Sequence, residues 1–236
     1  MNSIMRNERG NASIYLIWMI FVMGLMLILI LNIGKIFLTN QQASIGVEQA
    51  SLAATAIVFD AVREAVDDYD EYQENKFYQT AEEGAIFPIE RKLSYKIGKE
   101  EESLKHSGYT NNEAAIKAID HIVTSHLPGE DDMLRSYVNH HLDGKKPAIR
   151  SEIASMLVQN DGETRNAKVT LFKEERGSYF GHSSFHIEVA TTKTFKGTEF
   201  QSFFPPVTKD MDQIGIGPTI EFAKNLNRMT ETFQVQ

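Results

Sequence analysis

The sequence predicts an α+β protein in which a long N-terminal transmembrane helix extends into a soluble domain, where helices are followed by a small antiparallel sheet. Three observations predict this fold. Residues 10–34 carry no charge and are strongly apolar. The first proline is Pro88, and the apolar side chains before it recur with helical spacing. The last third contains alternating segments rich in β-branched and aromatic residues, as strands are.

The apolar run predicts a transmembrane helix over residues 12–34. A hydrocarbon core of about 30 Å requires about 20 apolar residues in a helix, and this run is long enough. A cleaved secretory signal has a shorter apolar core that ends in a small-residue cleavage site. A buried core helix rarely avoids charge over such a length. We therefore expect a retained anchor rather than either alternative.

Basic residues predict the orientation of this anchor. Arg6 and Arg9 precede the helix, Lys35 follows it closely, and the next basic residue is Arg63. Basic residues favour the cytoplasmic side of a membrane. We expect a cytoplasmic N-terminus over residues 1–11 and a single crossing of the cell membrane. A helical extension over residues 35–75 and an α+β domain over residues 76–236 are then extracytoplasmic.

The helix is expected to continue beyond the membrane, over residues 41–72, because no glycine occurs between Gly46 and Gly84. Residues 50–56 are mostly small, and small residues allow helix backbones to approach closely. This stretch is a candidate packing surface for a helix of another protein or of a second copy. The alternative is an ordinary amphipathic helix that covers its own domain. The candidate surface consists of Ala50, Ala53, Ala54 and Ala56.

Shorter elements are expected in the rest of the chain. Residues 87–97 predict one or two short strands, because Pro88 and Gly98 act as breakers. Periodicity and punctuation predict three helices and then three strands, with a hairpin loop at residues 176–181 and a break at residues 215–218. Residues 220–233 predict a last helix or a frayed tail. The helices are expected over residues 110–126, 131–142 and 149–159, and the strands over residues 167–172, 185–195 and 198–204.

Composition disfavours several classes of function. The net charge of -8 disfavours nucleic acid, whose phosphates require a basic face. The chain has no cysteine, which excludes disulfides, thiolate metal sites and cysteine nucleophiles. The seven histidines lack metal-ligand spacing, and Gly215-Ile216-Gly217 lacks the third glycine and the helix of a dinucleotide site. We expect no cofactor, no metal and no small-molecule substrate, and we do not expect an enzyme.

The N-terminal region carries motifs in a characteristic order. Arg9-Gly10-Asn11-Ala12 precedes the apolar helix, and Gln42-Ala43 and the small-residue stretch from Glu48 to Ala56 follow it. Over residues 7–60 this order resembles the TadE/TadG-like N-terminal region family of the Tad (Flp) pilus-assembly system. The resemblance implies a pilin-like fold and a bacterial cell-surface location. It also implies two kinds of partner, the lipid bilayer and other pilus-assembly or pilin-like membrane proteins.

The same resemblance implies a processing site and qualifies it. Prepilin peptidases cut after a glycine, so Gly10 and Asn11 form the candidate site. The mature protein that begins after such a cut usually carries glutamate at its fifth position, where this chain has Tyr15. The departure favours a minor or assembly component, such as a pseudopilin, over a major filament subunit. The alternative function is a membrane-anchored extracellular ectodomain that binds or senses through a membrane partner.

Overall fold

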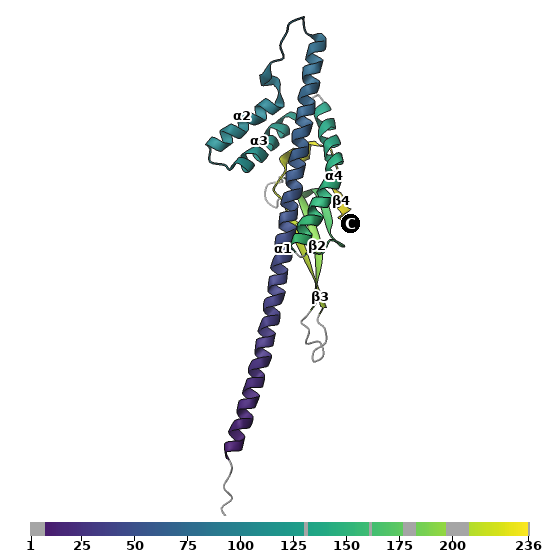
Figure 1. The fold of residues 1–236 in the computed structure, drawn as a ribbon. Coiled ribbons are helices and arrows are strands. Elements are labelled where there is room, and N and C mark those ends of the chain that lie inside the picture. The colour runs from purple at the N-terminus through teal and green to yellow at the C-terminus, as the bar shows by residue number, and fades with distance from the viewer. Residues whose placement is uncertain (1–7, 130–131, 161, 177–182, 197–207, 236) are drawn as a thin grey trace, which may run out of the picture. The chain divides into compact units, whose positions relative to one another are not determined.

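The computed structural model describes residues 8–129, 132–160, 162–176, 183–196 and 208–235 (Figure 1). Helices come first and the sheet follows, which confirms the α+β class. The helices are α1 (Glu8–Thr80), α2 (Leu93–His106), α3 (Asn111–His126) and α4 (Met133–Gln159), and the short 3-10 helices are η1 (Ile89–Arg91) and η2 (Glu221–Asn225). The strands are β1 (Lys168–Arg176), β2 (Ser183–Lys196), β3 (Thr208–Ile216) and β4 (Glu231–Gln234).

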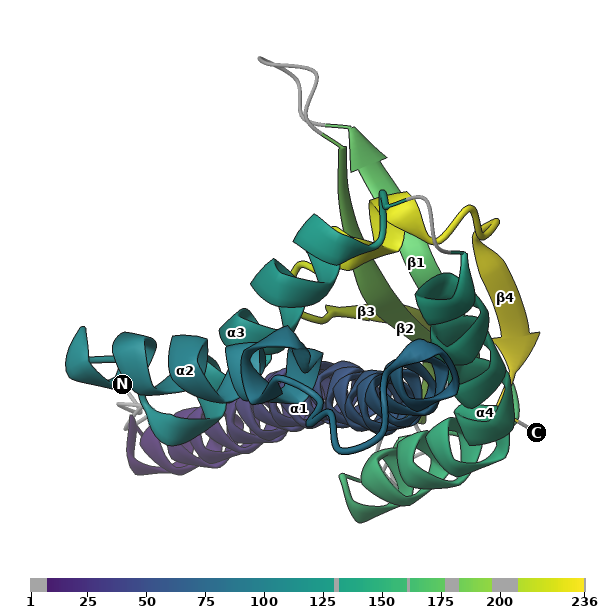
Figure 2. The same cartoon turned by 90° about the horizontal axis from the view of Figure 1, so that it is seen from above.

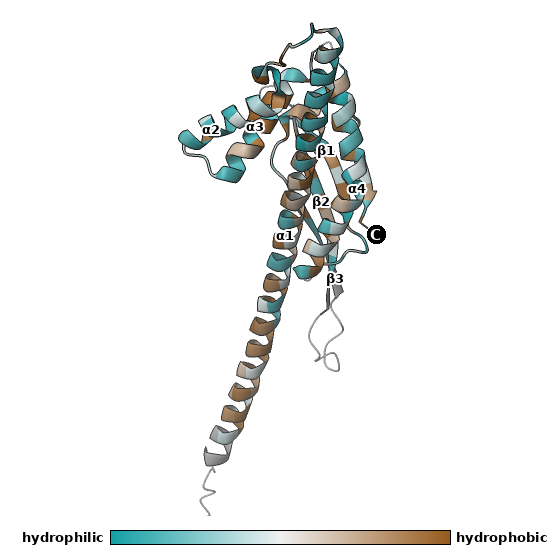
Figure 3. Ribbon diagram, turned by 45° about the horizontal axis from the view of Figure 1, so that its top comes forward, coloured by the Kyte–Doolittle hydropathy of each residue, from teal (hydrophilic) through white to brown (hydrophobic). Residues whose placement is uncertain are grey.

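The chain forms two compact units. The first comprises Met1–Gln42 and Thr194–Met211, and the second comprises Ala43–Lys193 and Asp212–Gln236. In the first unit, the large side chains of α1 from Ile14 to Leu38 are mostly exposed and apolar. In Figure 3 the ribbon of this part of α1 is mostly brown, the colour of hydrophobic residues. The second unit holds the buried core, so the two units differ in what they require from their surroundings.

The sheet has the strand order β3-β2-β1-β4. Strand β1 pairs antiparallel with both β2 and β4, and Val169 lies opposite Val189 on β2 and Phe233 on β4. The register of β1 shifts between Thr170 and Lys173. In a regular strand neighbouring side chains face opposite ways, but at this irregularity the consecutive Leu171 and Phe172 are both buried. The bulge thereby turns an extra aromatic ring into the core.

One face of α1 supplies the centre of the core. Its buried residues follow one another at intervals of three or four, which places them on a single side of the helix. Helix α4 lies beside this part of α1, as Figure 2 shows, and His141 and Lys145 of α4 bind Asp68 and Glu64 of α1. Residues on this buried face include Val47, Ala50, Ala54, Val58, Ala61 and Ala65.

Strand β3 crosses α1 so closely that only glycine fits. A Cβ atom built on Gly215 would lie 2.2 Å from the carbonyl oxygen of Val47 and 2.3 Å from its carbonyl carbon. One built on Gly217 would lie 2.6 Å from Oγ1 of Thr55. Backbone atoms cannot move aside as a side chain can, so Gly215 is required by the fold. The predicted break at residues 215–218 is wrong at its start, because Gly215 and Ile216 belong to β3.

The prediction of strands in residues 87–97 is also wrong, because the segment contains η1 and the start of α2. A carboxylate from α1 explains the helix. Oδ1 of Asp70 accepts a hydrogen bond from the backbone N–H of Leu93 at 2.7 Å, and Oδ2 accepts one from the N–H of Ser94 at 2.9 Å. These N–H groups have no partner within a helix, so Asp70 stabilises the N-terminus of α2 from a distant position.

Other expectations for residues 131–233 are corrected or lie outside the described residues. Residues 131–142 and 149–159 are not separate helices, because α4 runs through Pro147 and buries Leu142 and Ile149 on either side of it. Residues 220–233 form η2 and the start of β4 rather than a helix or frayed tail. The expected strand at residues 198–204 lies outside the described residues, as does the expected hairpin loop at residues 176–181 apart from Arg176, which ends β1.

Strand β4 is tied to α4 by charged groups. Lys146 of α4 binds Glu231 at 2.7 Å and Asp143 at 3.0 Å, and Arg228 binds both carboxylates. The hydrogen bond from Lys146, with a smaller effect from Arg228, holds the pKa of Glu231 below its ordinary value of 4.5, although partial burial opposes the shift. The charged form of Glu231 is therefore the form that stabilises the fold.

We expect Gly215→Ala to destabilise the protein by about 1–3 kcal/mol, because the new methyl group would overlap the backbone of Val47. Thermal unfolding of the full chain in detergent, followed by circular dichroism, measures the effect. Gly98→Ala is the matched control, since nothing lies within 4 Å of a Cβ there. Inside α2 that change should stabilise by about 0.5–1 kcal/mol. Equal melting temperatures for the two variants would contradict the close crossing.

We expect Glu231→Gln to lower the free energy of unfolding at neutral pH by about 1 kcal/mol or less, because the group is partly exposed. A carboxylate whose pKa is lowered by folding stabilises the folded protein above pH 4.5, the ordinary pKa of the group. This stabilisation is lost as the pH falls through the lower pKa of the folded state. The difference between variant and unaltered protein should therefore shrink below pH 4.5. Melting curves across that range test this, with the exposed Glu71→Gln as control; a difference independent of pH would refute it.

Candidate functional site

The first candidate feature is the exposed apolar segment of α1. Its exposed large side chains range from 38% accessible at Ile36 to 72% at Tyr15. In the part of the chain that the structure describes, α1 is the one helix long and apolar enough to cross a membrane. Water does not favour so large an apolar surface, which marks a contact with lipid or with another protein.

The candidate processing site lies at the beginning of α1. Gly10 and Asn11 fall within the first turn of the helix, which begins at Glu8. Their position between the preceding Arg6 and Arg9 and the apolar segment agrees with the order seen in the sequence. Cleavage after Gly10 stays a prediction.

The candidate packing surface divides between the two sides of α1. Ala50 and Ala54 are completely buried in the protein's own core, whereas Ala53 is partly exposed and Ala56 is exposed. The hypothesis that a second helix packs on this stretch stays a prediction, and Ala53 and Ala56 are the two residues of the set that such a helix could reach.

Two hydroxyl groups on the buried side of this stretch form hydrogen bonds to carbonyl groups of α1 itself. Oγ of Ser51 donates to the carbonyl oxygen of Glu48, and Oγ1 of Thr55 donates to that of Ser51, each at 2.8 Å. Both side chains are buried, and a buried hydroxyl without a partner would be costly. Because Ser51 and Thr55 are small and their hydroxyls bond within α1, Gly217 can approach the helix closely. The sequence signal was present in Gly215-Ile216-Gly217, but nothing local shows which helix those glycines meet.

An exposed face remains on the same part of α1. Ile45 is 47% accessible and Leu52 is 53% accessible, and the two are separated by two helical turns. Ala56 lies one further turn along on this side. This face, defined by Ile45, Leu52, Ala53 and Ala56 and called the outer α1 face below, offers apolar and small side chains together. Such a combination suits close contact with another helix.

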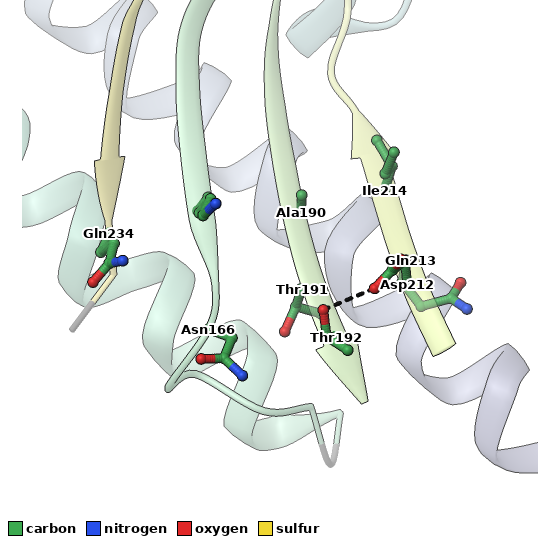
Figure 4. A pocket seen from close by; sticks show the side chains of 9 residues that line it. Asn166, Ala190, Thr191, Thr192, Asp212, Gln213, Ile214 and Gln234 are labelled. Atoms are coloured by element: carbon green, nitrogen blue, oxygen red, sulfur yellow. Dashed lines mark hydrogen bonds between the residues drawn. The ribbon is translucent and has the colours of Figure 1, made fainter. Parts of the chain in front are cut away.

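A pocket of about 490 Å³, lined by both polar and apolar groups, lies on the exposed face of the sheet (Figure 4). Oγ1 of Thr192 donates to Oδ1 of Asp212 at 2.9 Å across β2 and β3, as the dashed line shows. Hydroxyl, amide and ammonium groups at such a surface can bind water or a polar chain. The polar residues at this pocket include Asn166, Lys168, Thr192, Asp212, Gln213 and Gln234.

The most buried perturbed carboxylate has a structural task. Burial raises the pKa of Asp120 on α3, while hydrogen bonds from the backbone N–H groups of Glu221 and Phe222 oppose the rise. Those bonds measure 3.0 and 2.9 Å and cap η2. Within the described residues, no three histidine, aspartate or glutamate side chains are grouped so that they could hold a metal ion.

Sequence reasoning missed a second pocket, of about 400 Å³, that draws residues from α1, η1, α2 and α3. Its members Lys76, Arg91, Lys96 and His126 come from four separate segments of the chain. No spacing rule joins residues so far apart, and the wrong strand prediction for residues 87–97 placed two of them incorrectly.

Comparison with known proteins agrees with the N-terminal part of this description. Residues 10–62 match the family described as "Putative Flp pilus-assembly TadE/G-like". This confirms the resemblance inferred from the sequence. The match includes the apolar segment and the small-residue stretch of α1 and leaves residues 63–236 outside it. Searches among curated proteins and among solved structures gave no match.

We expect Ala54→Leu and Ala56→Leu to differ sharply in stability. Ala54 is fully buried, so the larger side chain should cost about 1–3 kcal/mol through overpacking. Ala56 is exposed, and leucine is a good helix former, so its substitution should leave the melting temperature nearly unchanged. Circular dichroism melts of both full-length variants in the same detergent provide the measurement. A large loss at Ala56 would show that the two sides of α1 have been assigned incorrectly.

Proposed function

We propose that the protein is a single-pass membrane component of a Tad/Flp-type pilus or related secretion apparatus, and that it acts by helix packing and protein–protein assembly. The family match over residues 10–62 carries this proposal. The matched segment contains both parts of α1 that such a role would use, the exposed apolar run and the outer α1 face.

Membrane anchoring explains the exposed apolar run. Lipid would cover the side chains between Ile14 and Leu38 that water surrounds unfavourably. Arg6 and Arg9 favour a cytoplasmic N-terminus, which would put the second unit outside the membrane. An extracytoplasmic domain on a membrane helix is suited to contact other components of a surface apparatus.

The outer α1 face supplies a route for lateral association. Ile45 and Leu52 would bury apolar surface against a neighbouring helix, and Ala53 and Ala56 would allow its backbone to come close. Tyr15 stands where processed pilins usually carry glutamate, which favours a minor or assembly component over a major subunit.

A mechanical rather than catalytic role is part of the proposal. The polar groups best suited to chemistry are engaged in structural bonds: Asp70 caps α2, Asp120 caps η2, and His141 lies 2.7 Å from Asp68 and 3.4 Å from Glu64. These contacts stabilise the arrangement of helices that an assembly protein must present.

We expect capture of the protein from solubilised native membranes, through a C-terminal tag, to bring down pilus-assembly proteins identified by mass spectrometry. Ala56→Leu should reduce their recovery, because the added bulk would separate the packed helices. Asn75→Leu, an equally exposed change further along α1, should not.

Recovery of the protein without such partners would contradict the proposal, and equal recovery with Ala56→Leu would contradict the role of the outer α1 face. The N-terminal peptide read in the same experiment decides processing. A peptide that begins at Asn11 indicates cleavage after Gly10, and a peptide that retains Arg6 and Arg9 indicates an uncut anchor.

A further inference from the structure

The second pocket, lined in part by the C-terminal end of α1 and called the distal pocket below, has a basic lining although the chain as a whole is acidic. Its charged lining residues are the basic Lys76, Arg91 and Lys96, in a chain with a net charge of -8. Among the described residues, no carboxylate oxygen lies within the 4.0 Å ion-pair distance of any of these three cations. Three cations without a carboxylate partner among the described residues therefore line one cavity of an acidic protein.

Neighbouring lysines show that carboxylates are otherwise used for pairing. Lys92, which follows Arg91 and precedes α2, binds Glu74 at 2.7 Å. Lys105, in the last turn of α2, binds Glu101 at 2.6 Å. Among the described residues, Lys99 of α2 also has no carboxylate at ion-pair distance, but its ammonium lies over the Tyr95 ring and outside the pocket lining. The uncompensated charge creates a positive potential at the pocket, which attracts an anionic group.

His126 holds Lys96 in place at the pocket wall. A lysine ammonium can only donate, so Nε2 of His126 accepts the 3.1 Å bond from Nζ of Lys96. The ring proton is then on Nδ1, which donates to the carbonyl oxygen of Ile122 at 2.8 Å. This bond uses one of the three ammonium hydrogens and leaves two for a ligand. Lys96 is half-buried, so its orientation is better fixed than that of a surface lysine.

Apolar groups adjoin the cations. The rings of Phe77 and Phe87 lie edge to face with centroids 5.4 Å apart, and both line the pocket. On the same segment Ile86 is 83% accessible and Ile89 is 55% accessible. A small anion would leave the two phenylalanine rings and these neighbouring isoleucines in water, whereas a polypeptide offers apolar side chains as well as charge. The combination therefore favours a peptide ligand.

We propose that this pocket binds an acidic peptide segment of a partner protein. Carboxylates of that segment bind Lys76, Arg91 and Lys96, and an apolar side chain packs against Phe77 and Phe87. The site lies outside the family match, so it does not depend on the pilus role.

Fluorescence anisotropy of the full chain in zwitterionic nanodiscs tests the proposal. The probe is a short fluorescein-labelled peptide of alternating glutamate and leucine, and peptides of alternating lysine and leucine and of glutamate and serine are compared with it. We expect the acidic, apolar peptide to bind most tightly and its affinity to fall as sodium chloride is added. Arg91→Gln and Lys96→Gln should each weaken binding about fivefold.

Lys99→Gln is the matched control. Lys99 is an exposed lysine of α2 outside the pocket lining, and its ammonium lies over the Tyr95 ring, 4.9 Å from the centroid. Its loss should change the affinity less than about twofold. Equal losses for Lys99→Gln and Lys96→Gln would overturn the proposal, since general attraction would then explain binding. So would unaltered affinity in Arg91→Gln and Lys96→Gln. Inhibition by free glutamate or inorganic phosphate at the concentrations at which the peptide binds would overturn it in favour of a small-anion site.

Discussion

The approach of β3 to α1 is the contact on which the second unit depends. Gly215 of β3 lies directly against the backbone of Val47, and Gly217, just after the strand, lies against the hydroxyl of Thr55. A single methyl group at Gly215 would separate the edge of the sheet from the helix. Strands β2, β1 and β4 follow in order from that edge, and their buried face completes the same core. The small side chains on the buried side of α1 are therefore needed for folding of the protein itself.

This use of small residues changes the meaning of the sequence pattern. A helix rich in alanine suggests contact with another helix, yet Ala50 and Ala54 serve the internal core. Ala53 and Ala56 leave the other side available. Because helical spacing alternates the two sides every few residues, one short stretch can contribute to folding and to assembly at once. Substitutions in this stretch have to be chosen by side, since a change at Ala54 would confuse loss of folding with loss of binding.

Local sequence properties predicted the long helix, the α+β order and the start of α3. The apolar run, the absence of proline before Pro88 and the segment that begins with Thr110 are all local signals. Thr110 forms a capping box with Glu113, and α3 begins at the next residue, Asn111. The missed elements depend on distant residues. Asp70 caps α2 from α1, and burial on both sides of Pro147 keeps α4 continuous. The four basic members of the distal pocket could not be grouped because the chain brings them together only after folding.

The family match ends before the part of α1 that lines the distal pocket. Residues 10–62 contain the apolar run and the outer α1 face, which require only a helix of the right composition and a sheet that packs on its small side. The pocket requires more, because Lys76, Arg91 and Lys96 come from three different elements and are brought to one cavity only by the fold. Among the described residues no carboxylate pairs with any of the three cations, so a bound ligand would supply the negative charge that they lack. A helix that anchors and associates at one end would then present a selective binding site at the other, and recruitment would be separable from anchoring.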